Sequence, residues 1–130
     1  MNPEQFLNEV VRFGELILVA KKEGVISELK GKFTAEMGEE WLTVKNQGCH
    51  CHVHMKPSDM ETVRFVKSRN KEGRELLALE FLNLKDELLF KISYPTKSDF
   101  KKAQSAFREI QNKFADGRER VQFTKEEVMG

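Results

Sequence analysis

The chain has 130 residues and a formal net charge of +1, from 22 Lys and Arg against 21 Asp and Glu. This balance excludes a strongly basic nucleic-acid platform or a cationic membrane-binding protein as the first interpretation, and we expect no nucleic-acid partner. Hydrophobic residues make up 39% of the chain and ten residues are Phe, which suffices for a packed core and argues against disorder.

A short helix and then a long β-rich region are predicted in the first three quarters of the chain. Asn2 and Pro3 are a typical helix start, and apolar residues at helical spacing continue until Gly14 ends the helix. From residue 15 to residue 94, short apolar runs alternate with turn residues. We predict strands at 15–21, 25–30, 32–37, 41–46, 49–56, 61–68, 74–83 and 87–94. Their close spacing and tight turns favour an antiparallel meander.

A second helix is predicted after Pro95. Apolar residues follow at spacings of 3, 4, 3 and 4, and they form one stripe: Phe100, Ala103, Phe107, Ile110 and Phe114. Such a stripe is typical of a helix that lies on a sheet, and Gly117 ends it. We therefore expect one α+β domain over residues 1–130, with a core at 15–116, a polar tail at 117–130, an N-terminal helix and a C-terminal amphipathic helix packed on the sheet.

The chain carries no sign of membrane insertion or of a common catalytic motif. No apolar run approaches the roughly 18 residues of a membrane-spanning helix, so we expect a cytoplasmic protein. Two Cys two positions apart do not form a disulfide framework, which fits a reducing compartment. The common nucleotide-binding and hydrolase signatures are missing from the sequence. We therefore expect binding rather than catalysis.

Both Cys and all three His lie in the run Cys49-His50-Cys51-His52-Val53-His54. If residues 49–56 form a strand, successive side chains point to opposite faces. One face then carries the two Cys with two apolar residues: Cys49, Cys51, Val53 and Met55. We expect this face to pack in the core, because free Cys behaves as a small hydrophobe. The other face carries a row of imidazoles: His50, His52 and His54.

This row supports three interpretations. Imidazoles two positions apart on a strand are separated by about 6.8 Å and can tilt together to chelate one divalent ion such as Zn, Ni or Cu. A metal site of this kind needs a further ligand from another strand or loop, for which the candidates are Glu36, Asp59 and Glu61. The second interpretation is a planar ligand such as haem, and the third is a solvated face without any ligand.

Several runs resemble the haem-utilisation carriers of the HutX and ChuX type, in the HemS/ChuX-like superfamily. The resemblance covers roughly residues 48–115 and is carried by four runs: 52–56 (His-Val-His-Met-Lys), 61–66, 77–83 and 87–92. It implies a cytoplasmic haem-binding or haem-trafficking protein. The fold it implies is a large, strongly bent antiparallel sheet flanked by helices, which forms a homodimer through sheet contacts.

The resemblance also points to particular residues. His54 falls where the family carries a His implicated in haem binding, whereas the family's other His would fall close to Ala20. Haem further requires cations for its propionates and an apolar groove. Lys56 and Arg64 are the candidate cations, and His52 is a second candidate ligand. Three aromatic residues are candidates for the groove: Trp41, Phe33 and Phe65.

We therefore expect a haem carrier or store in which His54 binds the iron. The alternatives are a divalent-metal module that uses the His row, and a dimeric interaction scaffold without haem. A haem-degrading activity stays open, although no residue pattern argues for it.

Overall fold

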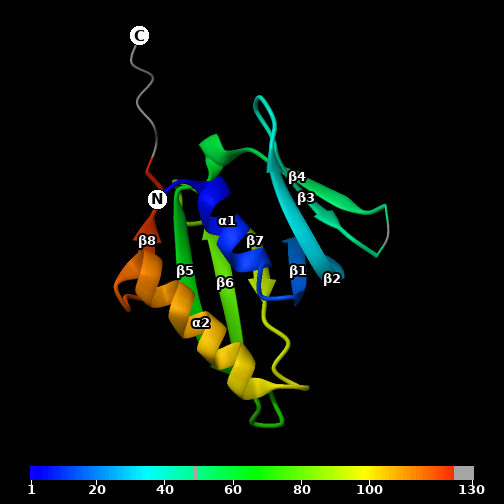
Figure 1. Cartoon of the computed structure of the whole chain (residues 1–130), viewed down its shortest axis with the longest axis vertical. Coiled ribbons are helices and arrows are strands. Elements are labelled where there is room, and N and C mark those ends of the chain that lie inside the picture. Colours follow the sequence, from blue (N-terminus) through cyan, green and yellow to red (C-terminus); the bar gives the residue numbers. More distant parts are fainter. Residues whose placement is uncertain (49, 125–130) are drawn as a thin grey trace.

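The computed structural model describes residues 1–48 and 50–124, and it contains one eight-stranded sheet with two helices on one of its faces (Figure 1). The elements follow one another as α1 (Pro3–Val11), β1 (Glu15–Lys22), β2 (Val25–Met37), β3 (Leu42–Asn46), β4 (His52–Met55), the short 3-10 helix η1 (Pro57–Asp59), β5 (Thr62–Arg69), β6 (Glu75–Leu82), β7 (Leu88–Ser93), α2 (Phe100–Ala115) and β8 (Arg120–Gln122). In the described residues, neither helix has an apolar stretch long enough to cross a bilayer.

The sheet consists of two antiparallel meanders joined side by side. Its strand order is β4-β3-β2-β1-β7-β6-β5-β8. β1 to β4 form the first meander and β5 to β7 the second, and the two meet where β1 pairs with β7 in the register Ile17↔Ser93. The predicted α+β fold, with an antiparallel sheet carrying an N-terminal and a C-terminal helix, is confirmed.

One long strand stands where two short ones were predicted. The expected break at Gly31 is wrong, because β2 runs through this residue from Val25 to Met37. Gly31 adopts a φ of +147°, and a Cβ at this position would lie 2.9 Å from the Asn46 side-chain nitrogen. Gly31 and Lys32 still pair with β1, and the pairing with β3 begins at Phe33. The strand therefore changes its partner just after Gly31 without ending there.

The core lies between the sheet and the two helices, and Phe6 of α1 is at its centre. Phe6 is fully buried, and its ring makes edge contacts with four other aromatic rings at centroid distances of 5.1 to 6.3 Å: Phe65, Phe81, Phe114 and Phe123. α2 buries Ala103, Phe107 and Ile110 against the same core, as its spacing predicts. The Asn2 side chain caps α1 by accepting the Gln5 N–H at 2.7 Å.

The part of the chain predicted as a polar tail contributes to the fold. Residues 120–122 form β8, which pairs with β5 in the register Val63↔Val121. Phe123 is buried in the core, and Thr124 accepts a hydrogen bond from the Met1 ammonium group at 2.7 Å. The core therefore extends past its predicted limit at residue 116. Residues 125–130 of the predicted tail lie outside the described part of the chain.

We expect Phe6→Ala to lower the free energy of unfolding by about 3–5 kcal/mol, because it removes a fully buried ring that joins α1 to α2 and the sheet. Urea unfolding followed by far-ultraviolet circular dichroism measures this loss. Leu84→Ala is the control, since Leu84 is 79% exposed and its truncation should change stability by less than about 0.5 kcal/mol. Similar losses in the two variants would contradict the central role of Phe6.

Candidate ligand-binding site

β4 places His52 and His54 together on one face at the edge of the sheet. Among the described residues this strand pairs only with β3, in the register Thr43↔His54 and Lys45↔His52. Met55 is buried and Val53 half-buried, whereas both imidazoles are exposed on the opposite face. Their ring centroids lie 4.7 Å apart. The alternation predicted for these two residues is therefore found in the structure.

The strand is shorter than predicted, which changes the positions of His50 and Cys51. Asn46 closes a loop before β4 with two hydrogen bonds. Its side-chain oxygen accepts the Gly48 N–H at 2.7 Å, and its backbone N–H donates to the Cys51 carbonyl at 2.9 Å. His50 lies within this loop and does not continue the row. Cys51 is exposed, so the prediction that it packs in the core is wrong. Cys49 lies outside the described residues.

The imidazole of His54 is held by the neighbouring strand. In antiparallel pairing, hydrogen-bonded pairs alternate with pairs whose side chains lie closer together. The Asn46 to Cys51 bond makes that pair a hydrogen-bonded one, so Thr43 and His54 form one of the closer pairs. The Thr43 hydroxyl oxygen accordingly lies 2.8 Å from His54 Nδ1. When Nδ1 carries the proton and donates it to this oxygen, Nε2 presents its lone pair to a ligand.

An aromatic ring and a cation lie next to His54. The Trp41 ring centroid is 6.4 Å from that of His54, and the Lys56 ammonium lies 4.9 Å from the Trp41 centroid. Trp41 is 44% exposed although it is large and apolar. The structure therefore gathers four of the predicted residues: Trp41, His52, His54 and Lys56. We call these four, with Thr43, the β4 cluster.

Three other predicted residues lie elsewhere. Arg64, on β5, forms an ion pair with Glu80 on β6. Six strand spacings separate β5 from β4, which corresponds to about 29 Å along the sheet. Phe33 and Phe65 are buried in the core and do not reach the face that carries the imidazoles. The β4 cluster therefore has Lys56, and not Arg64, as its cation.

A complete single-chain metal site is not found among residues 1–48 and 50–124, where no three His, Cys, Asp or Glu side chains gather to hold an ion. Of the candidate third ligands, Glu36 forms an ion pair with Lys45 at 3.3 Å. Asp59 is the last residue of η1. One chain thus offers two neighbouring imidazoles, which is fewer donors than a closed metal site requires.

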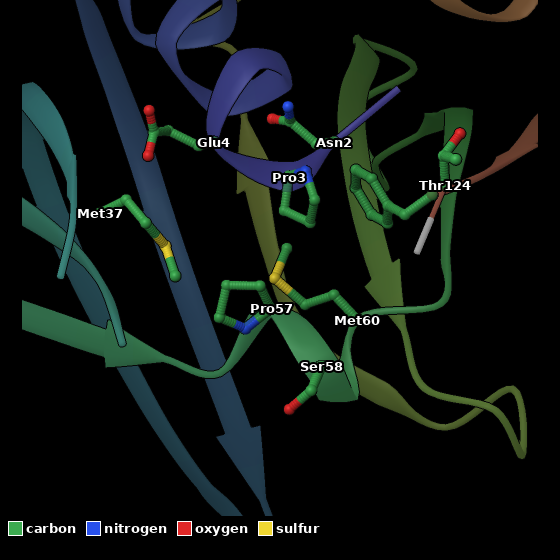
Figure 2. Close-up of a pocket in the computed structure, with 9 residues that line it drawn as sticks. Asn2, Pro3, Glu4, Met37, Pro57, Ser58, Met60 and Thr124 are labelled. Carbon is green, nitrogen blue, oxygen red and sulfur yellow. The ribbon is translucent and has the colours of Figure 1, made fainter. Parts of the chain in front are cut away.

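Two hollows of the surface lie away from the imidazoles. Figure 2 shows the first, of about 580 Å³, between the start of α1, the end of β2 and η1; its apolar lining includes Pro3, Met37 and Met60. The second, of about 660 Å³, lies over the face of the sheet opposite the helices, beside Ile17 and Val19. No histidine lines either hollow. Neither one therefore offers an imidazole to a ligand.

Tyr94 follows β7, far from the β4 cluster in the sheet order. Burial raises the pKa of this phenol well above its usual value, because the charged form would be desolvated. Its ring packs against Phe13 and Phe107 in the core. Tyr94 therefore stays neutral and acts as a core residue.

Comparisons with known proteins find a matching family model and several solved structures of similar fold. The family model matches residues 4–118. A solved structure of a protein from Erwinia carotovora has a TM-score of 0.74 and is 18% identical, over 84% of this chain and 69% of that one. The haem-binding protein ChuX has a TM-score of 0.72 at 16% identity, over 85% of this chain and 71% of its own.

A more distant similarity extends to an enzyme. ChuS, a haem oxygenase of E. coli, has a TM-score of 0.68 at 11% identity, over 84% of this chain and 35% of its own. At these identities the likeness concerns the fold. No curated protein matches the sequence.

We expect a double-mutant cycle of Trp41→Ala and Lys56→Ala to give a coupling of about 0.5–1 kcal/mol in the free energy of unfolding, as for exposed cation–π contacts. Urea unfolding of the four proteins measures it. A cycle of Trp41→Ala with Lys85→Ala, a lysine of the β6–β7 turn, is the control and should give no coupling. If both cycles give none, Lys56 does not hold Trp41 beside His54.

Proposed function

This chain belongs to the HutX/ChuX-type family of haem-utilisation proteins, within the HemS/ChuX-like superfamily, and we propose that it binds haem and carries it in the cytoplasm. The fold is shared with ChuX, whose structure is described as that of a haem-binding protein. The observation that carries the proposal is the exposed imidazole of His54, which Thr43 orients through Nδ1. This arrangement leaves Nε2 as a donor for the iron.

Each residue of the β4 cluster fits one requirement of haem. His54 supplies the axial nitrogen, and the Trp41 ring beside it supplies an aromatic surface for the porphyrin. Lys56 provides a positive charge on the same side, which suits a propionate. His52 is a second donor next to the first, at a centroid distance of 4.7 Å. Arg64, with its partner Glu80, has no part in this proposal.

The exposure of the cluster suits a carrier better than a catalyst. Both imidazoles are exposed, so a bound porphyrin keeps one side in contact with solvent or with a receiving protein. Catalysis requires a site that excludes water, and the imidazoles of the β4 cluster are exposed. Haem is therefore cargo in this proposal, held by one ligand and free to be passed on.

Divalent-metal binding is the second candidate function, and the close approach of the two imidazoles favours it. On one chain this pair supplies two donors, and the described residues add no third. Metal binding and haem binding can be told apart because haem needs His54 and its neighbours Trp41 and Lys56, whereas a chelated ion needs both imidazoles.

We expect haemin titrated into the untagged protein to give a saturable shift of the Soret band, and we expect His54→Ala to weaken binding at least about tenfold, because it removes the axial nitrogen. The absorbance titration gives the dissociation constant of each protein. His50→Ala is the matched control, since His50 lies in the loop before β4, and it should bind as the wild type does.

Two results would overturn the haem proposal. One is an unchanged haemin spectrum with the wild-type chain, and the other is a His54→Ala variant that binds haemin as tightly as the wild type. Circular dichroism of each variant shows whether the fold is intact, so that loss of binding is not mistaken for unfolding.

Thr43→Val should weaken haemin binding by about 10-fold to 100-fold, because it removes the hydroxyl oxygen that orients His54 while keeping the volume and the β-branched shape. The same absorbance titration measures the effect. Thr34→Val, at an exposed threonine of the neighbouring strand β2, is the control and should leave affinity unchanged. Equal affinity in the two variants would show that Thr43 does not position the ligand.

A further inference from the structure

β4 ends the strand order at one side of the sheet, so its outer side has no neighbouring strand among the described residues. The direction of its backbone groups follows from one hydrogen bond. Because the Asn46 N–H donates to the Cys51 carbonyl, Cys51, Val53 and Met55 direct their backbone groups toward β3. His52 and His54 therefore direct their N–H and C=O groups outward, on the strand whose imidazoles form the exposed pair.

Apart from its length of four residues, this edge lacks the features by which edge strands avoid one another. Protective edges carry Lys, Pro or a bulge, and β4 is composed of His-Val-His-Met with no bulge in its register with β3. Two cations lie on the same face: Lys45 is paired with Glu36 at 3.3 Å, and the Lys56 ammonium lies 4.9 Å from the Trp41 ring centroid. The net charge of +1 adds little repulsion between two copies. A second copy of this chain can therefore approach the edge.

We propose that a divalent transition-metal ion joins two copies of this chain edge to edge along β4, held by His52 and His54 of each copy. The two-fold register that places Val53 opposite the second copy's Val53 also places His52 opposite the second copy's His54. This inference goes beyond the proposed function, since it requires His52 and does not depend on haem.

The backbone favours this register. In it both His52–His54 pairs are hydrogen-bonded pairs, and the outward N–H and C=O groups of the two edges form four hydrogen bonds. A two-fold axis perpendicular to the sheet keeps all four imidazoles on one face. Side chains directly opposite across such a pair have Cβ atoms about 5 Å apart, and those along the strand are about 6.8 Å apart. Four imidazoles at these separations can converge on one ion.

The donor set fits the proposed ion. Four neutral imidazole nitrogens suit Zn²⁺ in tetrahedral geometry and Ni²⁺ or Cu²⁺ in tetragonal geometry. Thr43 holds Nδ1 of His54, so Nε2 is the donor of that residue. The second copy supplies the two ligands that the described part of a single chain lacks. Because the strand pairing covers only a few residues, we expect the contact to depend on the metal.

The test is the sedimenting mass of the untagged full chain, first stripped with EDTA and then given ZnCl₂ or NiCl₂ separately. We expect at least one of these ions to double the mass relative to the metal-free protein, with one ion bound per two chains by elemental analysis. His52→Ala should lose the doubling, whereas His50→Ala should keep it. The mass is measured without haemin, so its outcome does not depend on haem binding.

Three results would overturn it: neither ion changes the mass, the bound ion reaches one per chain without a change of mass, or doubling persists in His52→Ala. Circular dichroism of His52→Ala guards against unfolding, and His52→Gln, which keeps a polar side chain of similar size on the exposed face, must lose the doubling as well. Failure of haemin to bind the wild-type chain leaves the mass measurement unaffected.

Discussion

The packing of Phe6 is the contact on which the arrangement of the chain depends. This one side chain of α1 meets Phe114 of α2, Phe65 and Phe81 of the sheet, and Phe123 after β8. Both helices are thereby fixed on the same face of the sheet, so no helix of the described residues covers the opposite face (Figure 1). The imidazoles of β4 project from this uncovered face. The position of the candidate site is thus a consequence of where the helices pack.

Much of the fold follows from local patterns. The spacing of Phe100, Ala103 and Phe107 predicts α2 because a helix repeats every 3.6 residues, and the structure buries two of these three side chains. The two-residue period of a strand similarly places His52 and His54 on one face. Gly31 was misplaced as a break because a glycine in a strand resembles a turn signal, and only its approach to Asn46 shows its role. β8 has three residues, which is too short for a periodic signal.

The candidate site could be predicted only in part, because its remaining members come from pairing between strands. Thr43 reaches His54 through the register of β3 with β4, which the Asn46 loop sets and which no single run of residues reveals. The same loop delays the start of β4, and this explains the error for Cys51. Arg64 has a suitable charge for a haem propionate, but the charge of a residue does not reveal where it lies in the fold. The strand order places Arg64 six strands from His54.

The long strand β2 determines how the β3–β4 hairpin is attached to the rest of the sheet. The β3–β4 hairpin is attached to the sheet through the last five residues of β2, whereas the rest of β2 pairs with β1. Such a hairpin can unfold locally while the sheet under α2 stays intact, as a separate cooperative unit. A ligand bound to the β4 cluster would raise the free energy of unfolding of this unit. Amide hydrogen exchange would then slow in β3 and β4 and remain unchanged in β5, β6 and β7, so that ligand release and hairpin opening become one equilibrium.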